Sequence, residues 1–584
     1  MIHYYFKIAL RNLSKRKSYN LLNIFGLCIG MTCCLLIFHY VSFERSYDEQ
    51  IPKNTQIFRL RLDAYLKGEL LWKSATVFPA IAPTIKHDYP EVEEVCRLID
   101  AEMVLTNLDN NVKFSEKKGY FADSTFIKMF GLELIQGNSA QALVGPKKLI
   151  VSETMSQKYF GTTQSIGKQL ISKSRGADIY YEIAGVFKNY PSNSHLTIDY
   201  LASFDTYKML LTQWGDTTNI TETLFDNYDF YTYILFKPNT DVNKFESSLP
   251  SFCNKYMLQD LPSKTYNELH LIPVKDIHLY SNVNQEAEVN GNGQMVSFLL
   301  IIAFFIICIA WINYINLSTA RSVERAKEVG IKKVIGAIKS ELIKQFLVEN
   351  VVLNLISLLL SLMLFFIFLK YFDNYTGKVE ANSALLSFNY WLIFFTLFIV
   401  GTLLSGIYPA LVLSSFQPIK VLKGVYKNST GGIALRRTLV VMQFIISMIL
   451  ISGTVVVYQQ VSFMRNKNLG ATIDQTLIIN GAITDADSIY KTSYEPFKTS
   501  LLQLANVNKI AASSVVLGQE IYWTNGAKKF GDKPNSEITT YIFAIDYNFL
   551  ELYNIKLVAG RNFSPDFPND RKKCVLINEK AAHQ

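Results

Sequence analysis

Five blocks of apolar residues, each nearly free of charge, constrain this chain more than any other feature. They occupy residues 21–43, 296–319, 346–370, 390–413 and 438–460. A bilayer core about 30 Å thick needs about 20 apolar helical residues to cross it. A large soluble protein rarely buries five uncharged runs of that length, so we exclude a soluble fold. The sequence predicts an integral membrane α-helical bundle with five spans.

The overall composition agrees with this prediction. Apolar residues make up 49% of the chain and charged residues 18%, and the mean hydropathy is +0.15. A signal peptide is the alternative for the first block. That block is too long, and residues 43–47 offer no small-residue cleavage site, so we interpret it as a retained anchor.

The basic residues predict the orientation, because Lys and Arg mark the cytoplasmic side of a membrane protein. They gather before the first block and in residues 320–345 and 414–437, whereas residues 371–389 hold a single Lys beside two acids. We therefore expect a cytoplasmic N-terminus, with residues 44–295 and 461–584 outside. The net charge of +9 needs no nucleic acid to explain it.

The spans are expected to hold no buried ionisable residue of the kind that marks an ion or proton pathway. Glu349 is placed at the cytoplasmic interface and His39 at the outer one. Among the seven cysteines, Cys96 and Cys253 both lie outside the membrane, so a disulfide between them is left open.

Residues 44–295 alternate strand-like and helix-like patterns. Strands are predicted at 57–62, 180–187, 231–236 and 269–273, and a helix at 242–257. This order favours an α+β extracytoplasmic domain with ferredoxin-like pieces. The domain carries no recognised catalytic motif, and the spacing of His270 and His278 is not that of a metal site. A membrane-bound enzyme is therefore disfavoured.

An internal repeat links the two outer segments. The pattern from Phe126 to Gly137 returns from Phe549 to Gly560, and residues 149–153 resemble residues 575–579. Matches in the same order predict a tandem repeat. We expect one unit of four spans and an outer domain, followed by a second copy that is incomplete at Gln584. The chain is thus expected to be a fragment.

The stretch from Ala320 to Ala337, ARSVERAKEVGIKKVIGA, is the most distinctive in the chain. Its charges predict a short amphipathic helix at the membrane surface, and Gly330 and Gly336 permit close approach or a break. With ELIKQFLVEN at 341–350, YFKIALRNL at 5–13, GIYPA at 406–410 and QPIKVLKG at 417–424, it resembles the MacB/FtsX-type ABC transporter permeases. A merely topogenic basic loop is the alternative.

The resemblance implies a domain plan for the whole chain. It comprises an interfacial helix, a MacB-like core domain and a permease domain whose cytoplasmic loop couples to an ATPase. The implied segments are 1–20 (interfacial helix), 21–43 (first span), 44–295 (core domain), 296–319 (second span), 320–345 (coupling loop), 346–370 (third span), 371–389 (short outer loop), 390–413 (fourth span), 414–437 (linker), 438–460 (fifth span) and 461–584 (truncated second outer domain).

The resemblance also implies which residues contact the ATPase. They are Arg321, Arg325, Glu328, Gly330, Ile331, Lys332, Lys333, Gly336 and Ala337. The chain contains no G-x-x-x-x-G-K-[ST] phosphate loop, so we expect it to bind no cofactor and a separate ABC ATPase subunit to bind ATP. Further implied partners are a periplasmic adaptor or outer-membrane channel, and a dimer or pseudo-dimer formed through the repeat.

Two functions fit this resemblance. The first is an exporter that uses ATP-driven motion to extrude a drug, a peptide or a lipoprotein. The alternative is an FtsX-like regulator whose outer domain activates a cell-wall hydrolase without transport. The large outer domain and the repeat favour export.

Overall fold

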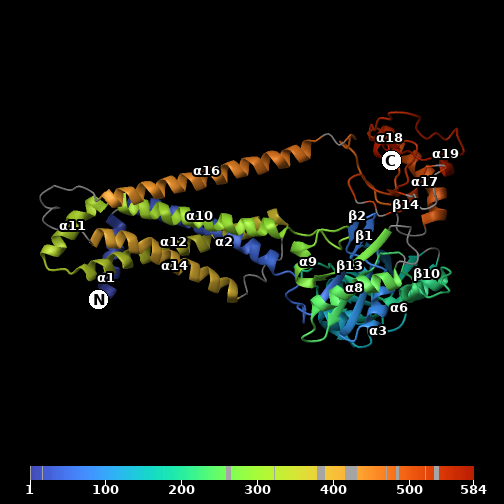
Figure 1. The fold of residues 1–584 in the computed structure, drawn as a ribbon, viewed down its shortest axis with the longest axis horizontal. Coiled ribbons are helices and arrows are strands. Elements are labelled where there is room, and N and C mark those ends of the chain that lie inside the picture. The colour runs from blue at the N-terminus through green and yellow to red at the C-terminus, as the bar shows by residue number, and fades with distance from the viewer. Residues whose placement is uncertain are drawn as a thin grey trace.

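The computed structural model describes residues 2–15, 17–174, 177–225, 227–257, 265–320, 322–377, 388–414, 430–467, 470–481, 486–519, 521, 523–529, 531 and 538–583. Figure 1 shows a long helical bundle, a sheet domain at one end of it, and a smaller C-terminal region beside the sheet domain. We call the end of the bundle that carries the sheet domain proximal and the opposite end distal.

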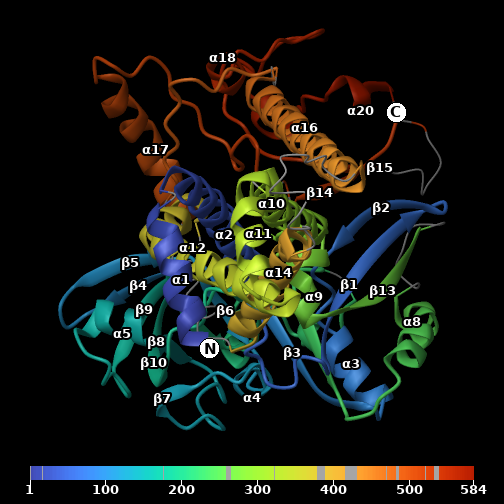
Figure 2. The same cartoon turned by 90° about the vertical axis from the view of Figure 1, so that its left-hand side faces the viewer.

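Five helices are long and apolar enough to cross a membrane. They are α2 (Lys17–Arg45), α10 (Gly293–Ala320), α12 (Lys339–Thr376), α14 (Phe388–Ser414) and α16 (Thr430–Asn466). Each predicted span falls within one of them, so the prediction of five long apolar helices is confirmed. The helix α16 lies along α10 at the edge of the bundle (Figures 1 and 2).

Helix α12 extends beyond its predicted span at both ends. Its first turn is capped by the carboxylate of Glu341, which accepts the N–H of Ile338, and it ends at Gly377 with a φ of 73°. Its 38 residues reach about 57 Å at 1.5 Å per residue, well over the bilayer core of about 30 Å. The rest of the predicted outer loop, 378–387, and most of the linker, 415–429, lie outside the described residues.

The sheet domain is a large mixed α/β sheet. Its strands are β1 (Ile57–Leu66), β2 (Glu69–Ser74), β3 (Val92–Asp100), β4 (Met103–Asn107), β5 (Val112–Glu116), β6 (Gly119–Ala122), β7 (Leu134–Gly137), β8 (Lys148–Ser152), β9 (Gln169–Ser174), β10 (Ala177–Phe187), β11 (Tyr200–Ser203), β12 (Tyr231–Phe236) and β13 (Thr265–Pro273). The order is β13-β1-β12-β3-β6-β11-β8-β10-β9-β4-β5, with β2 on β1 and β7 on β10. The pairs β6–β11 and β8–β10 are parallel, and the others are antiparallel.

Helices connect and cover this sheet. They are α3 (Ile81–Asp88), α4 (Phe126–Phe130), α5 (Glu153–Phe160), α6 (Phe204–Gln213), α7 (Ile220–Thr223), α8 (Val242–Tyr256) and α9 (Val274–Tyr280). The four predicted strands and the predicted helix at 242–257 all occur here. Every residue of β12 is buried, because the strand is central and packed on both faces, with Phe245 and Leu249 of α8 on one of them.

Cys96 and Cys253 do not pair in the structure. Both are free and buried, Cys96 on β3 and Cys253 on α8, and they belong to different parts of the hydrophobic core. The disulfide left open by the sequence is therefore absent, and each thiol acts as a small apolar side chain.

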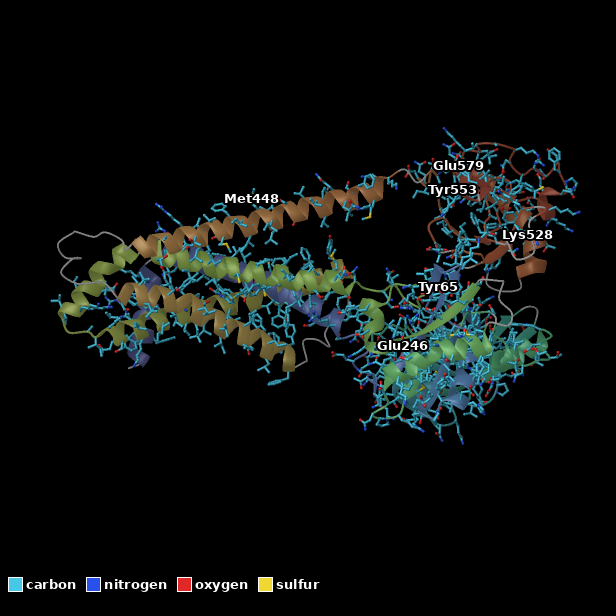
Figure 3. All side chains as sticks on the ribbon, in the orientation of Figure 1. Tyr65, Glu246, Met448, Lys528, Tyr553 and Glu579 are labelled. Carbon is cyan, nitrogen blue, oxygen red and sulfur yellow. The ribbon has the colours of Figure 1, made fainter. Side chains whose placement is uncertain are left out.

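The C-terminal region contains α17 (Ala486–Leu502), α18 (Phe549–Leu552), α19 (Asp570–Lys573), α20 (Glu579–His583) and the hairpin of β14 (Thr524–Ala527) and β15 (Ile538–Tyr541). Figure 3 labels Tyr553 and Glu579 in this region, which lies apart from the helical bundle beyond the end of α16.

Backbone hydrogen bonds around α18 match those around α4. The N–H of Leu132 bonds the carbonyl of Ile127 five residues earlier, and the N–H of Ile555 bonds that of Leu550 in the same way. Gly131 and Asn554 hold the matching left-handed position, with φ of 65° and 53°. The two short helices therefore end in the same local geometry.

We predict that both sheet-domain thiols resist alkylation until the protein unfolds. Burial raises the pKa of Cys253 to about 11 and also raises that of Cys96, so both stay neutral and shielded at pH 8. Peptide mass spectrometry after iodoacetamide treatment, native and then denatured, measures this. The exposed Cys574 serves as the accessible control, and a disulfide-linked peptide containing Cys96 and Cys253 would contradict the structure.

Candidate coupling site at the distal end of the bundle

The predicted surface helix is present as α11 (Ser322–Val334), at the distal end of the bundle (Figure 1). The helix ends at Val334, two residues before Gly336, whose φ is 107°. The N–H of Ala337 bonds the carbonyl of Lys332, and the N–H of Gly336 bonds that of Lys333. This pair of bonds is a Schellman motif, which needs the left-handed backbone that glycine adopts most readily. The predicted break at Gly336 is thus explained.

An ion pair fastens α11 to α12. The guanidinium of Arg325 donates to the carboxylate of Glu349 at 2.7 Å, and the two side chains are only 16% and 8% exposed. Although burial opposes its charge, the adjacent Glu349 raises the pKa of Arg325. Glu349, which the sequence places at the cytoplasmic interface, is buried between helices at the distal end of the bundle. Partial burial of both groups makes this pair sensitive to the loss of either partner.

Two further donors complete the environment of Glu349. The side-chain amide of Asn12, from α1 (Ile2–Lys15), donates to Glu349 at 2.6 Å. The amide of Gln345, one turn earlier on α12, donates at 3.3 Å. Three donors from three helices therefore converge on one carboxylate. We call this group, Asn12, Arg325, Gln345 and Glu349, the distal clasp.

The lysines of the motif also bond within the bundle. Lys332 Nζ donates to Glu328 at 2.8 Å and to Gln345 at 3.0 Å. Lys333 Nζ donates to the carbonyl of Ser414, the last residue of α14, at 2.7 Å. Burial, with the nearby Lys339, lowers the pKa of Lys333. Both ammonium groups thus help to hold α11 on α12 and α14.

Among the described side chains of α11 and the following turn, the most exposed are apolar, whereas the side chains of Lys332 and Glu328 are 32% and 40% exposed. Ile331 is 53% exposed, Val334 66%, Ile335 79% and Ile338 59%. We call these four residues the distal ridge. Among the other predicted contact residues, Gly330 is buried, Ala337 packs beside Val329, and Arg321 lies outside the described residues. A contiguous exposed apolar surface at the end of a bundle is typical of a docking site.

A second buried pair of ionisable side chains lies near the proximal end and contradicts the expectation that the spans hold none. His39 of α2 is fully buried, and its Nε2 lies 3.3 Å from Oδ1 of Asp373 on α12, which is 8% exposed. The prediction failed because a histidine and an aspartate far apart in sequence give no signal of their pairing. No group of three or more His, Cys, Asp or Glu side chains within the described ranges could hold a metal ion.

Comparison with known families gives two matches. Residues 20–252 match the MacB-like periplasmic core domain, and residues 300–418 match the FtsX-like permease C-terminal domain. The first match contains most of α2 and the sheet domain from β1 to β12, and the second contains α11, α12, α14 and the distal ridge. Together they place the sheet domain in the periplasm and identify the helices as permease helices.

Two curated proteins and one solved structure are similar to parts of this chain. The chain is 28% identical over 174 residues to the macrolide export ATP-binding/permease protein MacB of Bdellovibrio bacteriovorus, covering 28% of this chain and 26% of that protein. It is 30% identical over 119 residues to MacB of Burkholderia thailandensis, covering 20% and 18%. The periplasmic region of MacB from Actinobacillus actinomycetemcomitans aligns with a TM-score of 0.27 at 12% identity, covering 39% and 92%. The chain thus aligns with only about a quarter or less of each curated relative.

We predict that Glu349→Ala destabilises the bundle strongly. It leaves Arg325 without its carboxylate in a site largely removed from water, and loss of one partner of such a pair costs about 3–5 kcal/mol. Thermal unfolding of the full chain in detergent measures this, with Lys344→Gln as the control, because Lys344 is exposed on the same helix. Equal melting temperatures for the two variants would show that the distal clasp does not stabilise the bundle.

Proposed function

Since the chain belongs to the MacB-type family of ABC permeases, we propose that it transmits ATP-driven motion from a separate ATPase subunit to its sheet domain. It is a non-catalytic permease, and the ATP is bound by the partner. The single observation that carries the proposal is the distal ridge. Four exposed apolar side chains occupy the end of the bundle farthest from the sheet domain, where an ATPase would dock.

The membrane orientation that we propose follows from charge. The distal end carries α1, α11 and the start of α16 with Arg436 and Arg437, and Lys and Arg concentrate on the cytoplasmic side. The N-terminus and the distal ridge then lie in the cytoplasm of a bacterial cell, with the sheet domain and the C-terminal region outside. The domain limits predicted from the sequence, including 44–295 for the core domain, are part of this proposal.

We further propose that the C-terminal region begins a second copy of the same unit. Two observations support it beyond the matching sequence. The pairing of Leu98 with Ala122 has a counterpart in the bridge of Ser513 with Ile545. The side chain of Ser152 caps the N–H of Met155, and that of Asn578 caps the N–H of Ala581, three residues on in each case.

The substrate class that we propose is a drug, peptide or lipoprotein extruded by movement of the sheet domain. The two curated relatives are named for macrolide export. A large sheet domain together with a repeated unit favours extrusion over regulation of a cell-wall hydrolase. A periplasmic adaptor or outer-membrane channel would complete such a machine.

We predict that Ile335→Asp abolishes co-purification of the ATPase and its stimulation by the chain. A charge in the centre of the distal ridge would have to be desolvated on docking, which costs several kcal/mol. The measurement is affinity purification of the tagged full chain from its native membrane, followed by ATP hydrolysis of the captured complex in nanodiscs.

The matched control is Leu108→Asp. Leu108 is 63% exposed but lies on the sheet domain, at the other end of the molecule. Charge reversal at Lys332 and Lys333 forms a third arm, expected to reduce assembly by loosening α11. If Ile335→Asp retained a fully stimulated ATPase, the distal ridge would not be the docking surface. If the wild-type chain captured no ATPase, the proposed function would fail.

A further inference from the structure

Helix α12 carries a buried contact between ionisable side chains near each of its ends. Glu349 belongs to the distal clasp, and Asp373 approaches His39 near the proximal end. The two carboxylates are about 24 residues apart, or about 36 Å at 1.5 Å per residue. Because this distance exceeds the bilayer core of about 30 Å, one continuous helix joins ionic contacts at the two sides of the membrane.

Buried polar side chains line α12 between these ends. Asn350, Asn354, Ser357 and Ser361 are each at most 3% exposed and recur at helical spacing. The amide of Asn350 donates to the carbonyl of Thr402 on α14 at 2.6 Å. The hydroxyl of Thr32 on α2 lies 3.4 Å from the carbonyl of Ser361. Contacts of this kind hold α12 against α2 and α14 along its length.

The contact of His39 with Asp373 closes the proximal end. A buried carboxylate without a partner is costly in a bilayer, and a histidine beside it keeps the pair neutral overall wherever the proton resides. The edge of Phe365 packs against the His39 ring, with ring centres 6.0 Å apart. Since His39 lies six residues before the end of α2, this contact ties α12 to the segment of α2 that enters the sheet domain.

The end of α2 is in turn fastened to the sheet domain by two buried histidine–carboxylate pairs. Glu44 Oε2 lies 2.7 Å from His278 Nε2 on α9, and Tyr47 stacks on that ring at 3.3 Å. Asp48, four residues after Glu44, lies 2.9 Å from Nδ1 of His195. The Nε2 of His195 in turn contacts the hydroxyl of Tyr233 on β12 at 2.8 Å. Movement of α2 therefore reaches the central strands without a flexible linker between them.

Gly291 shows how closely this joint is packed. A Cβ at that position would lie 2.8 Å from His278 Nε2 and 2.9 Å from Glu44 Oε2. The chain entering α10 therefore passes directly against the Glu44–His278 pair. Both connections between the bundle and the sheet domain, through α2 and through α10, meet at one buried ionic contact.

We propose that α12 is the rigid lever of this permease and that His39 and Asp373 are positioning residues which pass its motion to α2 and the sheet domain. The distal clasp holds the lever to α11, and the His39–Asp373 contact holds it to α2. This inference rests on the proposed function, because it assigns the route by which the ATPase would move the sheet domain.

The test uses the full chain in nanodiscs, with spin labels introduced through non-canonical amino acids so that the native cysteines remain. Labels at Arg45 and Tyr375, both exposed, report the separation of α2 from α12 without any ATPase. Labels at Leu108 and Val558 report the ATP-dependent shift of the sheet domain against the C-terminal region in the captured complex. In the wild-type chain we expect a narrow distribution of distances between the labels at Arg45 and Tyr375. We expect the distance between the labels at Leu108 and Val558 to change on addition of ATP.

We expect His39→Gln and Asp373→Asn each to broaden the Arg45–Tyr375 distance and to abolish the ATP-dependent shift while ATP hydrolysis continues. The exchange of the two residues, His39→Asp with Asp373→His, should restore both. Lys370→Gln, one turn before Asp373 and exposed, is the control for loss of a charge on α12 and should leave both readouts unchanged.

Unchanged distances and an intact ATP-dependent shift in both single variants would overturn the inference. If the single variants fail to fold, failure of the exchanged pair to restore folding would also overturn it, because the contact would then not be the reason. If the chain captured no ATPase, the proposed function would be wrong. The Arg45–Tyr375 distances would still decide whether the contact of His39 with Asp373 holds α2 against α12.

Discussion

The carboxylate of Glu349 organises the distal end of the bundle, and much of the rest depends on how its charge is satisfied. An ionised carboxylate removed from water must be paired and hydrogen-bonded, or it destabilises the fold by several kcal/mol. Here the donors come from α1, from α11 and from α12 itself. Segments that the sequence separates by a whole domain are thereby brought to one point. The surface helix is consequently part of the bundle, and a force applied to it is applied to α12.

The polar side chains at the two ends of α12 differ from those in its middle. Ionisable side chains occur only toward its two ends, whereas its middle carries neutral Asn and Ser side chains that bond to carbonyls. A carbonyl within the bundle accepts such a bond at little cost, but a charge at the bilayer centre is expensive. The same distribution that keeps the helix stable in lipid also places its contacts between ionisable side chains where α12 meets α11 and α2. The stability of α12 in lipid and the transmission that we propose thus both require its ionisable side chains to lie at its two ends.

The five spans and the four strands were predictable because they are local patterns. Apolar runs of spanning length specify helices, and the alternating residues of β1 specify a half-buried strand. The sequence could not reveal the contact of His39 with Asp373, the distal clasp or the order of the sheet strands, because each joins residues far apart in the chain. The predicted block begins at residue 346 and concealed about two earlier helical turns, since polar residues from Lys339 onward continue the helix. Boundaries set by hydropathy therefore underestimated the element that matters most for transmission.

The coupling motif shows that a charge pattern leaves open which bonds its lysines make within the fold. Lys332 and Lys333 mark the cytoplasmic side during insertion, and their ammonium groups then bond to Glu328, Gln345 and Ser414 within the bundle. With these donors bonded inside the bundle, Ile331 and Val334 are the most exposed of the described side chains of α11. Apolar side chains form a better centre for a docking surface than lysines do, because lysine would have to be desolvated on binding. Lys332 and Lys333 help to hold the helix in position, and in the function that we propose the exposed apolar residues beside them form the surface that the ATPase contacts.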